Sequence, residues 1–282
     1  MPTPTAGALT RPRTEGQQPF GTGRTVGVFD AGIGGLPIAK RIRTAAPGAS
    51  ILYLGDTARR PYGPQPREAI MRYVSQVERF MSDADVDVWI IACNTASVVA
   101  EETLVGLLPF VDMVAAATSC VSPETLGPIG VLGTEGTIAS GAFTRALPDF
   151  EVLGVAAEEL LRLAELGGGD DPALLYQLAH KCAAALIESH VTTTILACTD
   201  FTCILPTMEQ AFGAGMKLID PADRAVELAC DILHSPSDAS GSEPSTRRDR
   251  LCFTAPAPID ARAYARDQFE LEMPDPEYVT LI

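Results

Sequence analysis

Short apolar runs alternate with amphipathic segments along most of the chain. The runs are four to nine residues long, are rich in Val, Ile and Leu, and each ends at Asp, Asn or Thr; they span residues 25–30, 51–56, 86–94, 127–134, 192–199 and 217–220. Apolar residues at helical spacing fill segments between them, at 36–45, 66–83, 172–189 and 222–233. Buried runs that alternate with amphipathic helices are typical of βα units in a parallel sheet. The pattern therefore predicts an α/β fold.

The length and the polar segments indicate how the chain is divided. Its 282 residues exceed the usual size of one domain and favour two α/β domains. The first 20 residues mix Pro, Thr, Gly and Gln with scattered Arg, so we expect a disordered tail without a targeting role. The Ser-, Pro- and Gly-rich segment 234–249 predicts a flexible loop, after which a strand and a helix should follow.

Composition and charge narrow the class of protein. The formal net charge of −15 argues against a nucleic-acid or anionic-membrane partner, because both would repel an acidic surface. No apolar run approaches the ~20 residues that cross a bilayer. The seven cysteines are odd in number and include no CxxC pair, which favours reduced thiols over a disulfide framework or a zinc site. We therefore expect a soluble, cytoplasmic protein without a bound metal.

The carboxyl ends of the predicted strands carry most of the candidate functional residues. These ends and the loops that follow them meet at one edge of a parallel sheet, where ligands bind. The residues at this edge are Asp30, Asp56, Cys93, Asn94, Thr134, Cys198 and Thr199.

Two of these strand ends share one design, an apolar run that ends in Cys and continues with small polar residues. Cys93 lies in IIACNTAS and Cys198 in TILACTDF. A thiol at the start of a helix meets unpaired backbone N–H groups and the positive end of the helix dipole, which favour thiolate. Two thiols on opposite sides of a substrate are suited to remove a proton from one face of a carbon and return one to the other. The alternative is that both cysteines only pack, since buried free cysteine behaves as a small hydrophobe.

Two turns offer backbone N–H groups to an anionic ligand. After the first strand the sequence DAGIGG places three glycines before a helix, at 32–35, where the backbone can approach a ligand closely. Its spacing does not match the GxGxxG pattern of dinucleotide-binding proteins, and an ordinary glycine turn is the alternative. The second turn, Pro-Tyr-Gly at 61–63, is stiff and also exposes backbone donors.

Taken together, these motifs resemble those of glutamate racemases, in the aspartate/glutamate racemase family. The matching positions run in the family's order from about residue 25 to residue 233: Asp30-Ala31-Gly32, Gly55-Asp56-Thr57-Ala58-Arg59, Pro61-Tyr62-Gly63, Cys93-Asn94-Thr95-Ala96, Gly133-Thr134, Thr137 and Cys198-Thr199.

The resemblance implies a fold and an activity. The fold is two flavodoxin-like parallel-sheet domains with pseudo-twofold symmetry and an active site in the cleft between them. We expect a disordered tail at 1–24, a first domain at 25–118 plus 222–282 and a second at 119–221. The activity is cofactor-independent racemisation of a small acidic amino acid by a homodimer, without pyridoxal phosphate or metal. Interconversion of L- and D-glutamate is the leading expectation, supplying D-glutamate to peptidoglycan or secondary metabolism.

The resemblance also implies roles for individual residues. Cys93 and Cys198 act as opposed acid and base, and Asp30 assists Cys93. Glu165 aligns with a carboxylate that the family places near the second cysteine. The substrate's amino and carboxylate groups are held at Ala31, Pro61, Tyr62, Gly63, Asn94, Thr95, Thr134, Thr137 and Thr199.

Two positions depart from the glutamate racemase pattern. Asp200 stands where the family has a histidine that partners the second cysteine, and Ala31 stands where Ser is usual. An ionised Asp disfavours a neighbouring thiolate, but a buried Asp with a raised pKa can accept the thiol proton as a general base. Three alternatives stay open: racemisation of aspartate or another amino acid, a catalytically impaired racemase fold kept for binding or regulation, and a one-cysteine decarboxylase or isomerase, against which the two cysteines argue.

Overall fold

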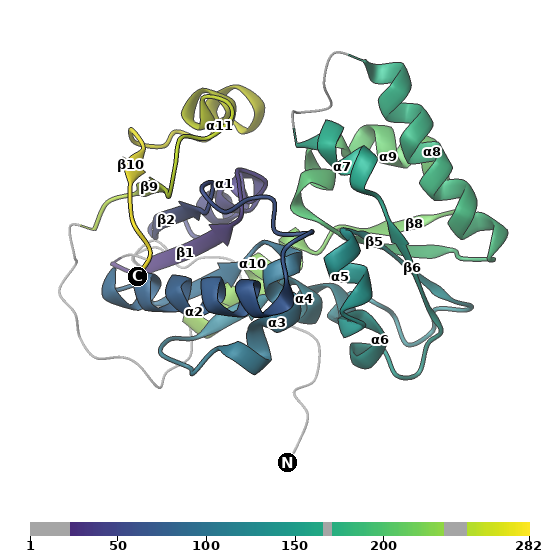
Figure 1. Cartoon of the computed structure of the whole chain (residues 1–282), viewed down its shortest axis with the longest axis horizontal. Helices are drawn as coiled ribbons and strands as arrows, with labels where there is room; N and C mark the ends of the chain where they lie inside the picture. Colours follow the sequence, from purple (N-terminus) through teal and green to yellow (C-terminus); the bar gives the residue numbers. More distant parts are fainter. Residues whose placement is uncertain (1–22, 166–170, 234–246) are drawn as a thin grey trace, which may run out of the picture.

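The computed structural model describes residues 23–165, 171–233 and 247–282, and these form two parallel β-sheets with helices on their faces (Figure 1). The α/β class predicted from the sequence is confirmed. The first 22 residues of the expected tail and residues 234–246 of the expected loop lie outside the described residues.

The first sheet has six described strands in the order β10-β9-β2-β1-β3-β4, and every pair is parallel. Both faces of such a sheet are covered by helices, so its central strands are continuously apolar rather than alternating. All six residues of the central strand β1 are buried. The strands are β1 (Thr25–Asp30), β2 (Ser50–Gly55), β3 (Val88–Ile91), β4 (Phe110–Asp112), β9 (Arg250–Phe253) and β10 (Glu277–Tyr278).

Successive side chains of these strands pack into two separate hydrophobic cores. Phe29 and Trp89 contribute to the core on one face, while Val28 and Ile90 contribute to the core on the other. This alternation follows from the two-residue period of a strand. The first core is closed by α2 (Arg67–Asp83) and α3 (Asn94–Thr103), and the second by α1 (Leu36–Ala45), α10 (Ala222–Leu233) and α11 (Ala261–Phe269).

The second sheet has four described strands in the order β6-β5-β7-β8, again all parallel. Leu132 and Leu196 pack under one set of helices, and Val131 and Ile195 pack on the opposite face. The strands are β5 (Ile129–Gly133), β6 (Val152–Ala156), β7 (Thr193–Ala197) and β8 (Lys217–Ile219). The helices are α7 (Glu158–Ala164), α8 (Pro172–Glu188) and α9 (Leu205–Phe212) on the first face and α4 (Met113–Ser119), α5 (Glu135–Ala139) and α6 (Ala142–Ala146) on the second.

The chain leaves the first sheet, builds the second and then returns. After β8 it enters α10, and the last strands extend the first sheet beside β2, so that the purple and yellow ends of the chain lie together in Figure 1. We propose the domain division that the sequence predicts, residues 25–118 plus 222–282 and residues 119–221. The sheet to which each strand belongs supports it.

The apolar runs predicted as strands all contain strands, but three further strands were not predicted. β4 and β10 are only three and two residues long, and β6 is partly exposed at the edge of its sheet. Short or half-exposed segments carry little hydrophobic signal. The expected helix after Cys198 is a six-residue 3-10 helix, η1 (Thr199–Ile204), which continues into α9.

Candidate active site

A cavity of about 310 Å³ lies between the two sheets, at the carboxyl ends of their strands. Its walls are the loops after β1, β2 and β3 in the first sheet, the loops after β5 and β7 in the second, and one face of α7. The residues predicted from the sequence that line it are Asp30, Ala31, Pro61, Tyr62, Gly63, Cys93, Asn94, Thr95, Thr134, Glu165, Cys198, Thr199 and Asp200. The remaining one, Thr137, is buried behind Thr134 and Thr95.

Cys93 lies at the N-terminus of α3, directly after β3, and its side chain is buried. Burial and, after it, the charge of Asp30 raise the pKa of the Cys93 thiol to about 12, although backbone N–H groups of Ala96, Ala31 and Thr95 oppose the shift. The backbone N–H groups at the start of α3 therefore favour the thiolate, as expected, but they do not decide the net pKa. Desolvation outweighs the backbone donors, so the thiol form dominates at neutral pH.

Cys198 lies directly after β7, at the start of η1, and its thiol contacts the carboxylate of Asp200. Its Sγ donates to Oδ2 of Asp200 across 3.6 Å. Burial and the charge of Asp200 hold the pKa of the Cys198 thiol well above its usual value. Burial, together with the charge of Asp30, also raises the pKa of Asp200 to about 7. A carboxylate with such a pKa is suited to exchange a proton with a neighbouring thiol near neutral pH.

Asp30 connects the two halves of the cavity. One of its carboxylate oxygens accepts the backbone N–H of Gly32 at 2.7 Å, and the other accepts the Thr199 hydroxyl of the second sheet at 3.0 Å. Burial raises the pKa of Asp30, while these two hydrogen bonds and the charge of Arg60 oppose the rise. The carboxylate therefore lies beside Cys93 while it is bonded to the residue that follows Cys198.

Polar side chains on the opposite wall are grouped around α3 and α5. The hydroxyls of Thr95, Thr134 and Thr137 lie within 2.9 to 3.3 Å of one another, which joins the start of α3 to the start of α5. Next to them, the amide oxygen and nitrogen of Asn94 are buried and have no hydrogen-bond partner among the described residues. Buried polar atoms are normally satisfied, so an unpartnered amide that lines a cavity indicates a ligand-binding group.

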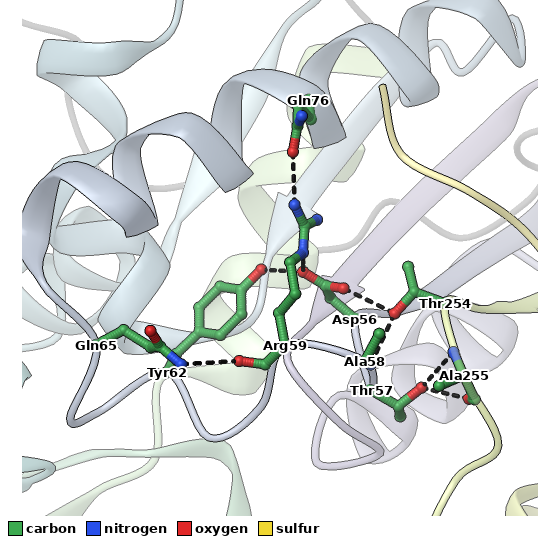
Figure 2. Close-up of polar contacts among 9 residues, drawn as sticks. All are labelled: Asp56, Thr57, Ala58, Arg59, Tyr62, Gln65, Gln76, Thr254 and Ala255. Carbon is green, nitrogen blue, oxygen red and sulfur yellow. Dashed lines mark hydrogen bonds and ion pairs between the residues drawn. The ribbon is translucent and has the colours of Figure 1, made fainter.

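The loop between β2 and α2, which carries residues 61–63, is stabilised by hydrogen bonds to Asp56 (Figure 2). This fully buried carboxylate accepts the Tyr62 hydroxyl, Nε of Arg59 at 2.6 Å and the Thr254 hydroxyl at 2.7 Å. Thr254 in turn accepts the backbone N–H of Ala58 at 2.9 Å. One buried carboxylate therefore holds Arg59 and Tyr62 of the loop directly and Ala58 through Thr254.

Several lining residues were missed from the sequence. They are Ile33, Arg60, Pro64, Glu135, Glu158, Leu161 and Arg162. Three of them lie on α7 together with Glu165, and their spacing of three, four and seven residues puts all four on one helix face. That spacing was available in the sequence, but nothing in it indicated that α7 would lie against a loop 100 residues away.

Comparison with known proteins decides the family. The model of the family described as Asp/Glu/Hydantoin racemase matches residues 37–229. The chain belongs to this racemase family. The racemase is 34% identical to a glutamate racemase of Geobacter metallireducens over 217 residues, 74% of this chain and 80% of the relative. It is 31% identical to a glutamate racemase of Bacillus cereus over 239 residues, 82% of this chain and 87% of the relative.

A solved structure has the same architecture. The racemase superimposes on glutamate racemase from Francisella tularensis in complex with D-glutamate with a TM-score of 0.81 and 29% identity, over 92% of this chain and 98% of that chain. Family and fold together make the racemase an amino-acid isomerase. None of the helices in the described part of the racemase has the length and apolar character needed to cross a membrane. No three His, Cys, Asp or Glu side chains of the described ranges are grouped so as to hold a metal ion.

Proposed function

We propose that the protein interconverts L- and D-glutamate without a cofactor, with Cys93 and Cys198 as opposed acid and base. The observation that carries this proposal is one cavity that holds both thiols together with two buried carboxyl groups, those of Asp30 and Asp200. Burial and the charge of Asp30 raise the pKa of the Cys93 thiol, and Asp200 accepts a hydrogen bond from the Cys198 thiol. The relatives named glutamate racemase, and the similar structure that contains D-glutamate, support glutamate as the substrate.

The reaction requires one proton to leave and one to arrive. The thiol on one side first passes its proton to its carboxylate, and the resulting thiolate removes the α-proton of the substrate. The carbanion that forms takes a proton from the thiol on the opposite face, which leaves that cysteine as thiolate and inverts the configuration. For the other enantiomer the two cysteines exchange roles. Burial raises the pKa of both thiols and of both carboxyls, which makes each carboxylate a stronger base towards the thiol on its side.

The groups that flank the thiols are suited to hold the α-amino and α-carboxylate groups. Asn94 and Thr95 follow Cys93 directly, and Thr199 follows Cys198, so a substrate with its α-carbon between the sulfurs lies within their reach. The unpartnered Asn94 amide supplies both a donor and an acceptor there. We further propose a cytoplasmic homodimer that supplies D-glutamate to peptidoglycan or secondary metabolism; the similarity to glutamate racemases supports this context.

Racemisation of aspartate is the second candidate, because Asp200 replaces the histidine that glutamate racemases carry beside the second cysteine. The test is to incubate the purified protein with each enantiomer of glutamate and of aspartate and to follow the optical signal of the amino acid. We expect turnover of glutamate in both directions. Turnover of aspartate alone would show that aspartate, and not glutamate, is the substrate. No turnover of either amino acid would favour a binding protein.

The same assay tests the roles of the two cysteines. Cys93→Ala and Cys198→Ala should each slow racemisation in both directions by roughly 10²–10⁴-fold, because every turnover uses one thiol as base and the other as acid. Cys120→Ala is the matched control, since this half-buried cysteine lies outside the cavity and should keep wild-type rates. Reversible turnover near the wild-type rate in either cavity variant would refute the assignment.

A further inference from the structure

Two adjacent arginines of the β2–α2 loop have different environments. Arg59 makes its contacts within the first sheet's half of the molecule: its Nε donates to Asp56 and a terminal nitrogen donates to Gln76 (Figure 2). Its guanidinium also lies 4.1 Å from the centre of the Tyr73 ring. Arg60 lines the cavity instead. The sequence alone does not distinguish the two, and only Arg60 is placed to contact a substrate.

Arg60 forms an ion pair across the cavity with Glu165 at the end of α7. The two side chains differ in burial, since 16% of the Arg60 side chain is exposed and 32% of that of Glu165. Glu165 can therefore exchange its partner for water at modest cost, whereas a guanidinium as buried as that of Arg60 requires a permanent anionic partner.

The charges around Arg60 show which anion suits it. Besides Glu165, the cavity is lined by Asp30, Asp200, Glu135 and Glu158. Among the described residues that line it, the only other guanidinium is that of Arg162, whose residue is exposed. The side-chain carboxylate of an acidic amino acid would be repelled by these groups unless a cation receives it. The guanidinium of Arg60 also passes within 3.7 Å of the position that a Cβ on Gly32 would take, so it lies close beside the loop after β1.

The position of Arg60 along the chain separates it from the groups that hold the α-carbon. Asn94, Thr95 and Thr199 are neighbours of the thiols and therefore surround the reacting centre. Arg60 belongs to a different loop and meets α7, which carries no thiol. A substrate held at its α-carbon by the first group would direct its side chain towards a separate wall such as this one.

We propose that Arg60 determines the specificity of the enzyme by binding the side-chain carboxylate of an acidic substrate, and that Glu165 occupies Arg60 in the free enzyme and is displaced when the substrate binds. This inference rests on the proposed racemisation of an acidic amino acid. One carboxylate replaces another, so the buried guanidinium stays paired throughout. Glu165 is then a competitor of the substrate rather than a ligand for it.

The sign of the change in KM tests the proposal. Arg60→Gln should raise KM for both glutamate enantiomers by roughly 10- to 100-fold with a much smaller change in kcat, because a charge-assisted hydrogen bond to the bound substrate is lost. Glu165→Gln should lower KM by a few-fold, because the competing carboxylate is gone. Arg60→Lys keeps the charge without the fork of donors, and its KM should lie between those of the wild type and Arg60→Gln.

Other outcomes would overturn the inference. If the ion pair only holds the cleft together, Arg60→Gln and Glu165→Gln should raise KM alike. A fall in affinity for glutamine parallel to that for glutamate in Arg60→Gln would assign Arg60 to the α-carboxylate instead. Should Arg60→Gln not fold, as checked by its melting curve, Arg60→Lys and Glu165→Gln still give opposite signs if the inference is right and the same sign if it is wrong.

Two controls separate this test from the proposed function. Arg67 and Glu102 form an exposed ion pair between α2 and α3, away from the cavity, so Arg67→Gln and Glu102→Gln should leave KM unchanged. If the wild type does not racemise glutamate or aspartate, the proposed function fails. If the wild type is active and the two cavity variants shift KM in the same direction, only the role of Arg60 and Glu165 fails.

Discussion

Individual residues at this site are governed by burial more than by helix dipoles. Cys93 and Cys198 both begin helical segments, yet burial raises the pKa of both thiols. Burial, together with the charge of Asp30, also raises the pKa of Asp200 to about 7, which makes this carboxylate a stronger base for the thiol whose hydrogen bond it accepts. A carboxylate with its ordinary pKa of 3.8 would be a far weaker base for a thiol.

The first prediction concerns Asp200 and pH. In the direction where Cys198 is the base, Asp200 must be ionised, so kcat/KM should fall as the pH is lowered through about 7. Asp200→Asn should remove this inflection and slow both directions by roughly 10²–10⁴-fold. pH–rate profiles with each enantiomer test this. An unchanged inflection in the Asn variant, or a rate equal to or above that of the wild type, would show that Asp200 only repels the thiolate.

The second prediction uses the same variant to separate chemistry from folding. The pKa of Asp200 is raised on folding, so the folded state binds its proton more tightly and this residue's contribution to stability falls as the pH rises from about 4 to above 7. Asn does not titrate. Relative to the wild type, Asp200→Asn should therefore gain stability on the order of 4 kcal/mol between pH 4 and pH 8 while it loses activity. Denaturant titrations at the two pH values measure it, and a relative loss of stability at pH 8 would contradict the buried carboxylate.

At the scale of elements, the β2–α2 loop depends on a strand that is distant in sequence. Thr254 follows β9 and belongs to the part of the chain beyond the family match at 37–229. The Thr254 hydroxyl donates a hydrogen bond to the Asp56 carboxylate and accepts one from the backbone N–H of Ala58. The same carboxylate also accepts hydrogen bonds from the side chains of Arg59 and Tyr62 (Figure 2). The last strands of the first sheet are therefore part of the support of the active site.

The third prediction tests this support. Thr254→Val keeps the shape of the side chain but removes both hydrogen bonds, which leaves the buried Asp56 with one donor fewer. We expect a loss of roughly 1–3 kcal/mol in the free energy of unfolding and a lower kcat/KM, because the loop at 61–63 loses its anchor. Thr254→Ser retains the hydroxyl and should restore both. Loss of stability and activity in Thr254→Ser but not in Thr254→Val would indicate that the methyl contacts matter and the hydroxyl does not.

The sequence revealed this site unevenly, for physical reasons. The strands that end near Asp30, Cys93 and Cys198 could be predicted from the sequence, because a buried parallel strand is apolar along its whole length and polar residues follow it. Asp56 was found by the same rule, but not its bond to Thr254, since 198 residues separate the partners. Arg60 was missed because two consecutive arginines look alike until their partners, Gln76 and Glu165, are known.

At the scale of the whole molecule, the two halves meet through closely packed backbone. A Cβ on Gly34 would lie 2.5 Å from the Thr199 hydroxyl and 2.7 Å from a carboxylate oxygen of Asp200. On the other side of the cavity, a Cβ on Gly136 would lie 2.6 Å from the carbonyl oxygen of Gly63. Glycines at these two contacts therefore set the separation of the halves, and with it the distance between the two thiols.

The fourth prediction follows from this contact. Gly34→Ala cannot be accommodated without moving Thr199 and Asp200, so it should slow racemisation by roughly 10²-fold and destabilise the fold by ~1–3 kcal/mol. Gly215→Ala is the matched control, because no atom lies within 4 Å of the added methyl group. Steady-state kinetics and melting curves measure both. Wild-type kinetics in Gly34→Ala would mean that the spacing of the halves does not control the reaction.

Proton exchange in deuterium oxide tests the two-thiol mechanism most directly. Each enantiomer of glutamate is incubated with the enzyme in this solvent, and the α-position of both enantiomers is analysed early in the reaction. Under the proposed mechanism Cys93 and Cys198 act on opposite faces of the substrate, so the proton removed by one thiol is not the one returned by the other. The product should therefore carry deuterium from the first turnovers while the recovered substrate keeps its proton, in both directions. Deuterium appearing in recovered substrate as fast as in product would indicate a single base and contradict the mechanism.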